Sequence, residues 1–429
     1  MKPCSMAVVW AAENVFECSN GALLNEGGLF MRLRIGPGAM VAAAFIGPGT
    51  ITTASVAGAT TGITLIWAIA FSVFATVLLQ ELAVRSALAT DRDLATLIRD
   101  FGAGYWWGAP LLLLIILAVG VGNAAYQSGN LSGAGIGLNT ALGTNFTSVV
   151  LLSATASATL IVINRYRLLE RILVVLVAAM GLLFTGLAIL LAPLLWVQPE
   201  VRLLPDFSYA NLTLVLALIG TTVVPYNLFL HATAARQHWQ GSSIGEALKG
   251  ARWESCVAIL FGGVTTTAIV VVAAALVPSA VDQPAMNAVI EAIEVQMPGW
   301  GVMILGMGLF AAGLTSAIAA PVAAGWTICG ALGWSVDPQS LRFKLVALTV
   351  VLIGGLFAVV TSRPSALILT AQVTNALLLP LIALVLIMVA NSSLLPSSYR
   401  NNVVLNATGI AVLVAMTLLA GGKLFKILG

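Results

Sequence analysis

The chain has 429 residues, of which 60% are hydrophobic and only 8% are charged. A soluble domain carries about 25% charged residues, so this composition excludes a soluble enzyme or a soluble binding module. The net charge of +3 gives no indication of nucleic-acid binding. We therefore expect an all-α integral membrane protein, with the lipid bilayer as its surroundings and no nucleic-acid partner.

The first 34 residues differ from the rest of the chain because they contain only one short apolar run, MAVVWAA. This run is too short to span a membrane and is not followed by a convincing cleavage site. We expect residues 1–34 to be a cytoplasmic tail, and residues 35–429 to be a single transmembrane domain.

Long apolar runs, separated by charged or turn-forming residues, predict the transmembrane helices. Each span needs about 20 mostly apolar residues. The sequence predicts eleven spans, at residues 36–62, 63–88, 106–130, 147–163, 168–195, 211–238, 252–278, 299–330, 342–361, 364–390 and 402–425. A short surface helix is expected within residues 278–298. Pro321 predicts a kink or an extra short helix in the eighth span.

Two of these spans contain breaks. The first is at Gly47-Pro48-Gly49-Thr50, in a stretch with no charge between Arg34 and Glu81, and the second is at Val224-Pro225. A proline inside a helix removes a backbone hydrogen bond. In lipid, a broken backbone is tolerated only where it is buried in protein or lines a wet cavity. Paired breaks in two halves of a membrane protein indicate the substrate site of a transporter.

Lysines and arginines predict the orientation, because loops on the cytoplasmic side carry an excess of both. With the N-terminus inside, 15 of the 19 basic residues are cytoplasmic and the C-terminus is extracellular. Spans one and six then cross the membrane in opposite directions. This predicts an inverted repeat of five plus five helices, with repeat one at about 35–195, repeat two at about 211–390 and an additional helix at about 402–425.

Several long segments resemble the Nramp family of divalent-metal transporters. GPGAMVAAAFIGPGTITTASVAGA and LLQELAVRSALATDRDLATLIRDFG resemble the first two spans of that family. TTVVPYNLFLHATAARQ resembles the sixth span, and LTAQVTNALLLPLIALVLI the tenth. The resemblance implies the LeuT-type fold, with broken helices one and six and a metal site at the two breaks.

The chain departs from the family at positions that the resemblance assigns to the metal. The Asp-Pro-Gly-Asn of span one is Gly47-Pro48-Gly49-Thr50 here, and the Met-Pro-His-Asn of span six is Val224-Pro225-Tyr226-Asn227. The second histidine of span six is kept as His231, and the metal-facing glutamine of span ten is kept as Gln372. The acids of span three that serve proton movement are replaced by Gln127 and Asn130.

These replacements resemble the Nramp-related magnesium transporters, a bacterial branch. A thioether favours soft transition metals, whereas Mg²⁺ takes oxygen ligands and retains several waters. A proton relay needs titratable groups, and within span six only His231 remains. We therefore expect a secondary transporter in the plasma membrane that imports Mg²⁺ as a largely hydrated ion by alternating access, without proton coupling, and that tolerates Mn²⁺.

The predicted cation site consists of Ala44, Gly47, Thr50, Thr221, Val224, Tyr226, Asn227, Gln372 and Asn375. Asn375 is included only because it lies three residues after Gln372, on the same helix face. Each polar residue of this group has an alternative role, in which its side chain forms a hydrogen bond between helices and does not contact the cation. The same alternative applies to His231 and to the amides of Asn123, Gln127 and Asn130. Glu81 and Arg85, four residues apart, predict an ion pair at the cytoplasmic boundary.

Other functions remain open from the sequence. One is a proton-coupled Mn²⁺ or Fe²⁺ symporter of the ordinary Nramp type, and another is an organic-substrate transporter with the same fold. We expect no catalytic residue and no cofactor, since the metal ion is the substrate, and we expect a monomer.

Overall fold

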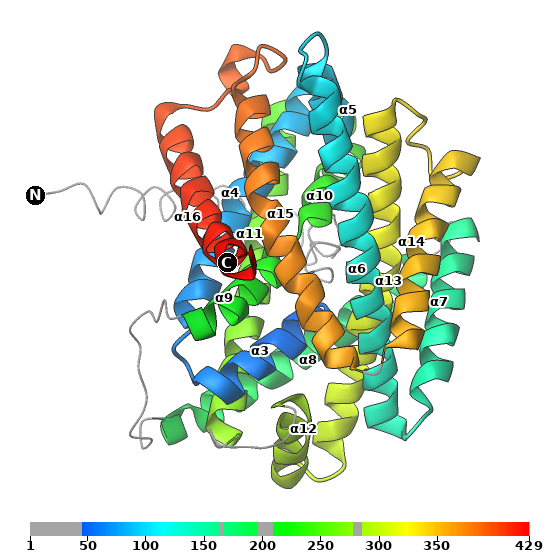
Figure 1. The fold of residues 1–429 in the computed structure, drawn as a ribbon, viewed down its shortest axis with the longest axis vertical. Helices are drawn as coiled ribbons and strands as arrows, with labels where there is room; N and C mark the ends of the chain where they lie inside the picture. The colour runs from blue at the N-terminus through cyan, green and yellow to red at the C-terminus, as the bar shows by residue number, and fades with distance from the viewer. Residues whose placement is uncertain (1–44, 164–166, 196–208, 278–284, 362, 429) are drawn as a thin grey trace, which may run out of the picture.

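The computed structural model describes residues 45–163, 167–195, 209–277, 285–361 and 363–428, which form α-helices, turns and one short 3-10 helix (Figure 1). The helices are α3 (Pro48–Thr61), α4 (Ile66–Thr90), α5 (Leu94–Gly102), α6 (Gly108–Leu142), α7 (Phe146–Ile163), α8 (Arg167–Leu195), α9 (Tyr209–Thr222), α10 (Pro225–His238), α11 (Ile244–Leu276), α12 (Ala285–Gln296), α13 (Trp300–Leu332), α14 (Leu341–Val360), α15 (Pro364–Asn391) and α16 (Val403–Leu428), with η1 (Ser397–Tyr399) before α16.

Within the described part of the chain, ten segments are long and apolar enough to cross a membrane, with α9 and α10 counted as one. They correspond to the second to eleventh predicted spans. The first predicted span is described only from residue 45 onward, as α3 and the turn before it. The break in the sixth span is confirmed, because α9 ends at Thr222 and α10 begins at Pro225. The predicted surface helix is also confirmed, as α12.

Three details of the predicted helices are wrong. Helix α13 runs through Pro321 without interruption, so there is no extra short helix at this position. Helix α6 continues to Leu142, well beyond the predicted end of the third span, and α11 begins at Ile244, before the predicted start of the seventh. Apolar runs show where lipid surrounds a helix, but a helix can extend beyond the lipid into polar sequence.

The helix ends follow local sequence signals. Pro48 and Pro225 occupy the first helical position of α3 and α10, where the missing N–H has no intrahelical role. Asp93 caps α5, and its side chain accepts a hydrogen bond from the backbone N–H of Thr96. Gly143 ends α6 in the left-handed conformation, which glycine adopts at little cost.

Helix α5 was not predicted from the sequence. It has only nine residues, yet Leu94, Leu97 and Ile98 on one side of it are buried. It is an amphipathic helix that connects α4 to α6. In Figure 1, α12 lies at the end of the molecule opposite to α5. The two connections therefore cover opposite ends of the helical bundle.

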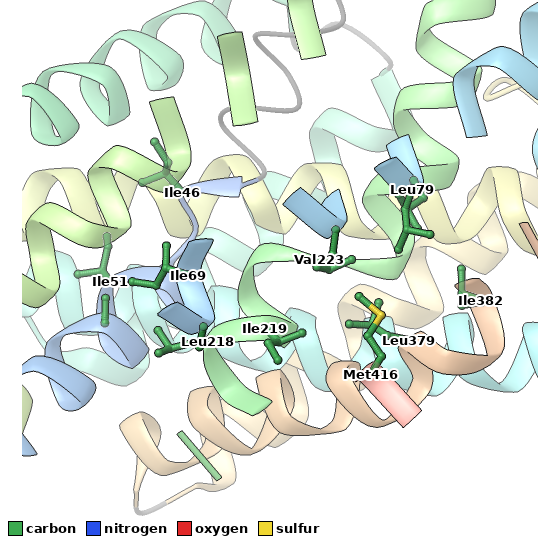
Figure 2. Packing of buried hydrophobic residues seen from close by; sticks show 14 of the residues in the cluster. Ile46, Ile51, Ile69, Leu79, Leu218, Ile219, Val223, Leu379, Ile382 and Met416 are labelled. Carbon is green, nitrogen blue, oxygen red and sulfur yellow. The ribbon is translucent and has the colours of Figure 1, made fainter. Parts of the chain in front are cut away.

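Most buried apolar side chains belong to one large cluster shared by α3, α4, α9, α11, α13, α15 and α16. It includes Ile219 of α9, Leu379 of α15 and Met416 of α16 (Figure 2). A second cluster joins the beginning of α10 to α6, α13 and α14. Val223 belongs to the first cluster and Val224 to the second. The break between α9 and α10 therefore lies where the two apolar clusters meet.

Small residues allow α6 to lie directly against α13. A Cβ added to Gly137 would lie 2.4 Å from the backbone N of Phe310, and one added to Gly313 would lie 2.6 Å from the backbone N of Ala134. Close contact of this kind between backbones is a common way for helices to associate within a membrane. It fixes the rotation of α6, and thus decides which of its side chains face the two helix breaks.

Candidate cation-binding site

Thr50 forms hydrogen bonds across the break before α3. The side-chain Oγ1 of Thr50 donates a hydrogen bond to the carbonyl O of Phe45, at 2.6 Å. The same Oγ1 lies 2.9 Å from Thr221 Oγ1 on α9. Because the one hydroxyl hydrogen of Thr50 is used on Phe45, the Thr221 hydroxyl is the donor in this second bond. Thr50 and Thr221 therefore join the two broken helices directly.

Gly47 occupies the N-cap position of α3. Its carbonyl O accepts the backbone N–H groups of Thr50, at 3.0 Å, and of Ile51, at 3.3 Å. Its φ of −85° is accessible to any residue, so glycine is not required here by the backbone. The other predicted residue of this segment, Ala44, lies outside the described residues.

The second break brings Val224, Tyr226 and Asn227 into the protein interior. Val224 is the N-cap of α10 in an extended conformation, and its carbonyl O accepts the N–H of Asn227 at 3.0 Å. The side chains of Val224 and Tyr226 lie in the second apolar cluster. The amide of Asn227 is buried, and neither its Oδ1 nor its Nδ2 has a hydrogen-bond partner among the described residues.

Gln372 of α15 contacts both broken helices. A Cβ added to Gly49 of α3 would lie 2.2 Å from Gln372 Nε2, and one added to Gly220 of α9 would lie 1.9 Å from the Gln372 carbonyl O. The Gln372 side chain is only 2% exposed, and its Oε1 has no partner within the described structure. Asn375, one turn further along, is also buried with its Nδ2 unpartnered. Glycines at positions 49 and 220 are needed for this close approach.

The structure thus brings three of the predicted residues together. Thr50, Thr221 and Gln372 lie together between α3, α9 and α15, and Gly47, Val224, Tyr226, Asn227 and Asn375 lie on the segments that surround them. A buried polar atom without a partner costs about 1–3 kcal/mol. Several such atoms at paired helix breaks are the arrangement expected of a polar ligand site. The part of the chain that the structure describes has no group of three or more His, Cys, Asp or Glu side chains suited to a metal.

The amides of span three have structural partners in α13. Gln127 Nε2 donates to the carbonyl O of Ala317 at 3.0 Å, and Asn123 Nδ2 donates to that of Ala320 at 3.1 Å. Pro321 has no N–H, so the carbonyl of Ala317 lacks its usual intrahelical partner. The Nε2 of Gln127 supplies a donor to this carbonyl in its place.

His231 is fully buried on α10 and is held by two polar side chains. Its Nδ1 lies 2.7 Å from Gln80 Oε1 of α4, and its Nε2 lies 3.4 Å from Ser255 Oγ of α11. An amide oxygen only accepts, so Nδ1 carries the hydrogen in this arrangement. His231 connects three helices, which agrees with the structural role left open by the sequence.

The predicted ion pair between Glu81 and Arg85 is confirmed, with 3.0 Å between Glu81 Oε1 and Arg85 Nε. The same Glu81 oxygen lies 2.7 Å from Arg252 Nη2 on α11. Arg85 also donates to the carbonyl O of Tyr399 and to Asn401 Oδ1, between α15 and α16. These two contacts were missed, because nothing in the local sequence indicates that residues more than 300 positions apart meet.

Comparisons with known proteins agree with this architecture. The chain matches the family model described as natural resistance-associated macrophage protein-like over residues 38–426. It is 27% identical to the divalent metal cation transporter MntH of Nostoc sp. in an alignment 385 residues long that covers 85% of this chain and 84% of that protein. It is also 27% identical to the MntH of Agrobacterium fabrum over 403 residues, covering 90% and 85% of the two chains.

Solved structures share the fold. A crystal structure of the Eremococcus coleocola manganese transporter, in complex with an aromatic bis-isothiourea compound, matches with a TM-score of 0.75 and 22% identity, over 92% of this chain and 87% of that one. MhsT in complex with L-phenylalanine matches with a TM-score of 0.56 and 17% identity, over 91% and 99%. These likenesses confirm the predicted LeuT-type fold. Since the family model covers nearly the whole chain, the protein belongs to the natural resistance-associated macrophage protein-like family.

Proposed function

We propose that this protein is a transporter of divalent metal cations whose principal substrate is Mg²⁺, with Mn²⁺ also accepted. The observation that carries the proposal is the neutral, oxygen-rich group at the two breaks, where the Thr50 and Thr221 hydroxyls lie 2.9 Å apart beside the unpartnered Oε1 of Gln372. The matched relatives whose names describe them as divalent metal cation transporters support the general class of substrate.

The preference for Mg²⁺ rests on the kind of ligands at these positions. Gly47 offers no carboxylate and Val224 no thioether, so the site lacks the soft sulfur ligand that favours transition metals. Mg²⁺ gives up its waters reluctantly. The hydroxyl and amide oxygens of Thr50, Asn227 and Gln372 are suited to accept hydrogen bonds from waters that remain on the ion. The cation is therefore proposed to bind largely hydrated.

Transport is proposed to be driven by the membrane potential and not by protons. At the positions where the family resemblance places the relay acids, Gln127 and Asn130 are neutral, and Gln127 is engaged with α13. An inside-negative potential contributes about 2.3 kcal/mol per charge per 100 mV, which is twice as much for a divalent ion. We propose uptake across the plasma membrane with the N-terminus inside, the C-terminus outside and one copy of the chain as the working unit.

Alternating access is proposed to occur by movement of one group of helices relative to another. Val223 and Val224 lie in different apolar clusters, so the peptide between them lies at the junction of the two clusters. Because packed interiors resist continuous deformation, a change between two arrangements would concentrate at this junction. The cation site lies next to it.

The test is Mg²⁺ uptake into proteoliposomes, with an internal Mg²⁺ dye and a pH dye read in parallel and protein-free liposomes as the control. We expect saturable Mg²⁺ influx without acidification. Acidification that follows metal influx would contradict the absence of proton coupling and favour an ordinary proton-coupled Mn²⁺ or Fe²⁺ symporter. Robust Mn²⁺ influx without Mg²⁺ influx would contradict the proposed substrate, and influx of neither ion would favour an organic substrate.

The substitutions Gly47→Asp, Thr50→Asn and Val224→Met, made together, are expected to shift selectivity toward Mn²⁺. Gly47 is an N-cap with negative φ, so the backbone permits an aspartate there, and a bound divalent cation would compensate the buried carboxylate. The thioether adds a soft ligand. We expect the ratio of Mn²⁺ to Mg²⁺ uptake to rise about tenfold, which corresponds to about 1.4 kcal/mol.

The matched control for this variant keeps the first two changes and replaces Val224 by leucine, which supplies similar volume without sulfur. The measurement is competition between the two ions in proteoliposomes. An unchanged uptake ratio in a folded triple variant would mean that these three positions do not determine selectivity.

A further inference from the structure

Helix α6 presents different residues to the cation site and to α13. Gly122, Gly129 and Gly133 recur along one side of α6, at spacings of seven and four residues. A Cβ added to Gly122 would lie 3.7 Å from Asn375 Oδ1, and one added to Gly133 would lie 2.1 Å from Pro48 Cβ. These distances place this side of α6 against α15 and the first helix break. Gly122 and Gly133 therefore mark the site-facing side.

Tyr126 lies on this same side, four residues after Gly122 and seven before Gly133. The neighbouring residues on this side of α6 are Gly122, Gly129 and Gly133, which have no side chains. Tyr126 is therefore the large side chain that α6 directs toward the site. It is 1% exposed, and its hydroxyl has no hydrogen-bond partner of ordinary geometry among the described residues. The side chains of Thr221, Tyr226 and Gln372 are its polar neighbours.

The ring of Tyr126 also contacts Tyr226 across the junction with α10. Their ring centroids are 5.2 Å apart, with an edge-to-face angle of 70°. The Tyr226 hydroxyl is likewise buried and unpartnered within the described structure. Two buried phenol hydroxyls therefore lie close to the helix breaks, and the ring contact restricts the positions of both side chains.

Waters bound to a divalent cation point their hydrogens outward, so a site for a hydrated ion needs hydrogen-bond acceptors around it. A phenol oxygen accepts such a bond. We propose that Tyr126 is a further residue of the cation site, and that its hydroxyl, together with that of Tyr226, accepts hydrogen bonds from the hydration shell of the divalent cation. This inference rests on the proposed function. It adds a residue on α6 to a site otherwise formed by α3, α9, α10 and α15.

The test is Tyr126→Phe, which removes the hydroxyl and keeps the ring contact. In proteoliposomes we expect the KM for Mg²⁺ to rise about tenfold, as for the loss of one hydrogen bond to a charged ligand, while the maximal rate changes by less than about twofold. Tyr226→Phe is expected to act in the same direction. The unfolding midpoint of each variant without Mg²⁺ should be equal to or higher than that of the wild type, because the removed hydroxyl is buried without a partner among the described residues. This separates a role at the site from a structural one, for which the midpoint would fall.

Trp326→Phe is the matched control. Trp326 lies in the same apolar cluster, and its indole N–H is also buried without a partner within the described residues. An indole N–H is only a donor, so it cannot accept from bound water. We expect its removal to leave the KM unchanged.

The outcomes separate this inference from the proposed function. If the wild type carries Mn²⁺ and not Mg²⁺, the proposed substrate is wrong, and Tyr126 is tested by the KM for Mn²⁺ instead. An unchanged KM of Tyr126→Phe for the ion that the wild type carries overturns the role of Tyr126 alone. A loss of maximal rate and stability at unchanged KM also overturns it. A wild type that carries no divalent cation overturns both.

Discussion

Replacing Gly220 by valine is expected to abolish cation uptake. Even the first side-chain atom at position 220 would lie 1.9 Å from the carbonyl O of Gln372 and 3.0 Å from the backbone N of Ala376. These are backbone atoms, so the overlap can be relieved only by moving α9 away from α15. Overpacking of this kind costs about 3 kcal/mol or more. The fraction of molecules with native spacing at the cation site would fall by about 100-fold.

The matched control is Gly186→Val in α8. A Cβ at Gly186 meets nothing within 4 Å, so this helix-interior glycine has room for a side chain. Uptake in proteoliposomes and the unfolding midpoint should both stay close to the wild-type values. If Gly220→Val transports as well as Gly186→Val does, the close contact between α9 and α15 is not required for transport.

Glu81→Gln is expected to give the largest loss of stability among substitutions of single charges. Glu81 neutralises two arginines, and the side chains of Glu81 and Arg85 are only 15% and 4% exposed. Removing one member of a buried ion pair leaves an uncompensated charge and costs about 3 kcal/mol. Arg85 keeps its bonds to Tyr399 and Asn401, so the variant should fold with a lower unfolding midpoint.

Asp91→Asn provides the comparison for Glu81→Gln. Asp91 pairs with Arg236 at 3.7 Å, but its side chain is 78% exposed. An exposed pair contributes less than about 1 kcal/mol, and asparagine accepts the left-handed backbone of this position. Chemical unfolding in detergent measures both variants. Similar losses in the two variants would contradict a special contribution from the buried network.

The sequence predicts those parts of the fold that follow from local rules. Lipid demands long apolar runs, and this requirement located ten of the described segments. The chemistry of proline predicts the helix break at Pro225, which pointed to the side chains of Thr221 and Asn227. The same chemistry does not break α13 at Pro321, so proline alone does not decide where a helix is interrupted. The replacement of residues that the family resemblance assigns to the metal, such as Val224, was visible from the motifs of the sequence.

The remaining features depend on how helices rotate and meet. Tyr126 lies on α6 between polar residues and glycines, and only the contacts of Gly122 and Gly133 with other helices show that its side faces the site. Arg85 and Asn401 are brought together by the path of the chain after α15. Short amphipathic helices such as α5 give a weak signal in a sequence dominated by long apolar runs.

The hydrogen bond from Gln127 to the carbonyl O of Ala317 restricts which residues can replace Gln127 in a single mutation. An ionised carboxylate at position 127 cannot donate, and it would face a carbonyl oxygen that Pro321 leaves without a partner. Acquisition of an acidic group there therefore depends on the residue at position 321, on a different helix. The two positions are expected to show epistasis, so that an acid at position 127 is tolerated better after Pro321 is replaced by a residue with an N–H.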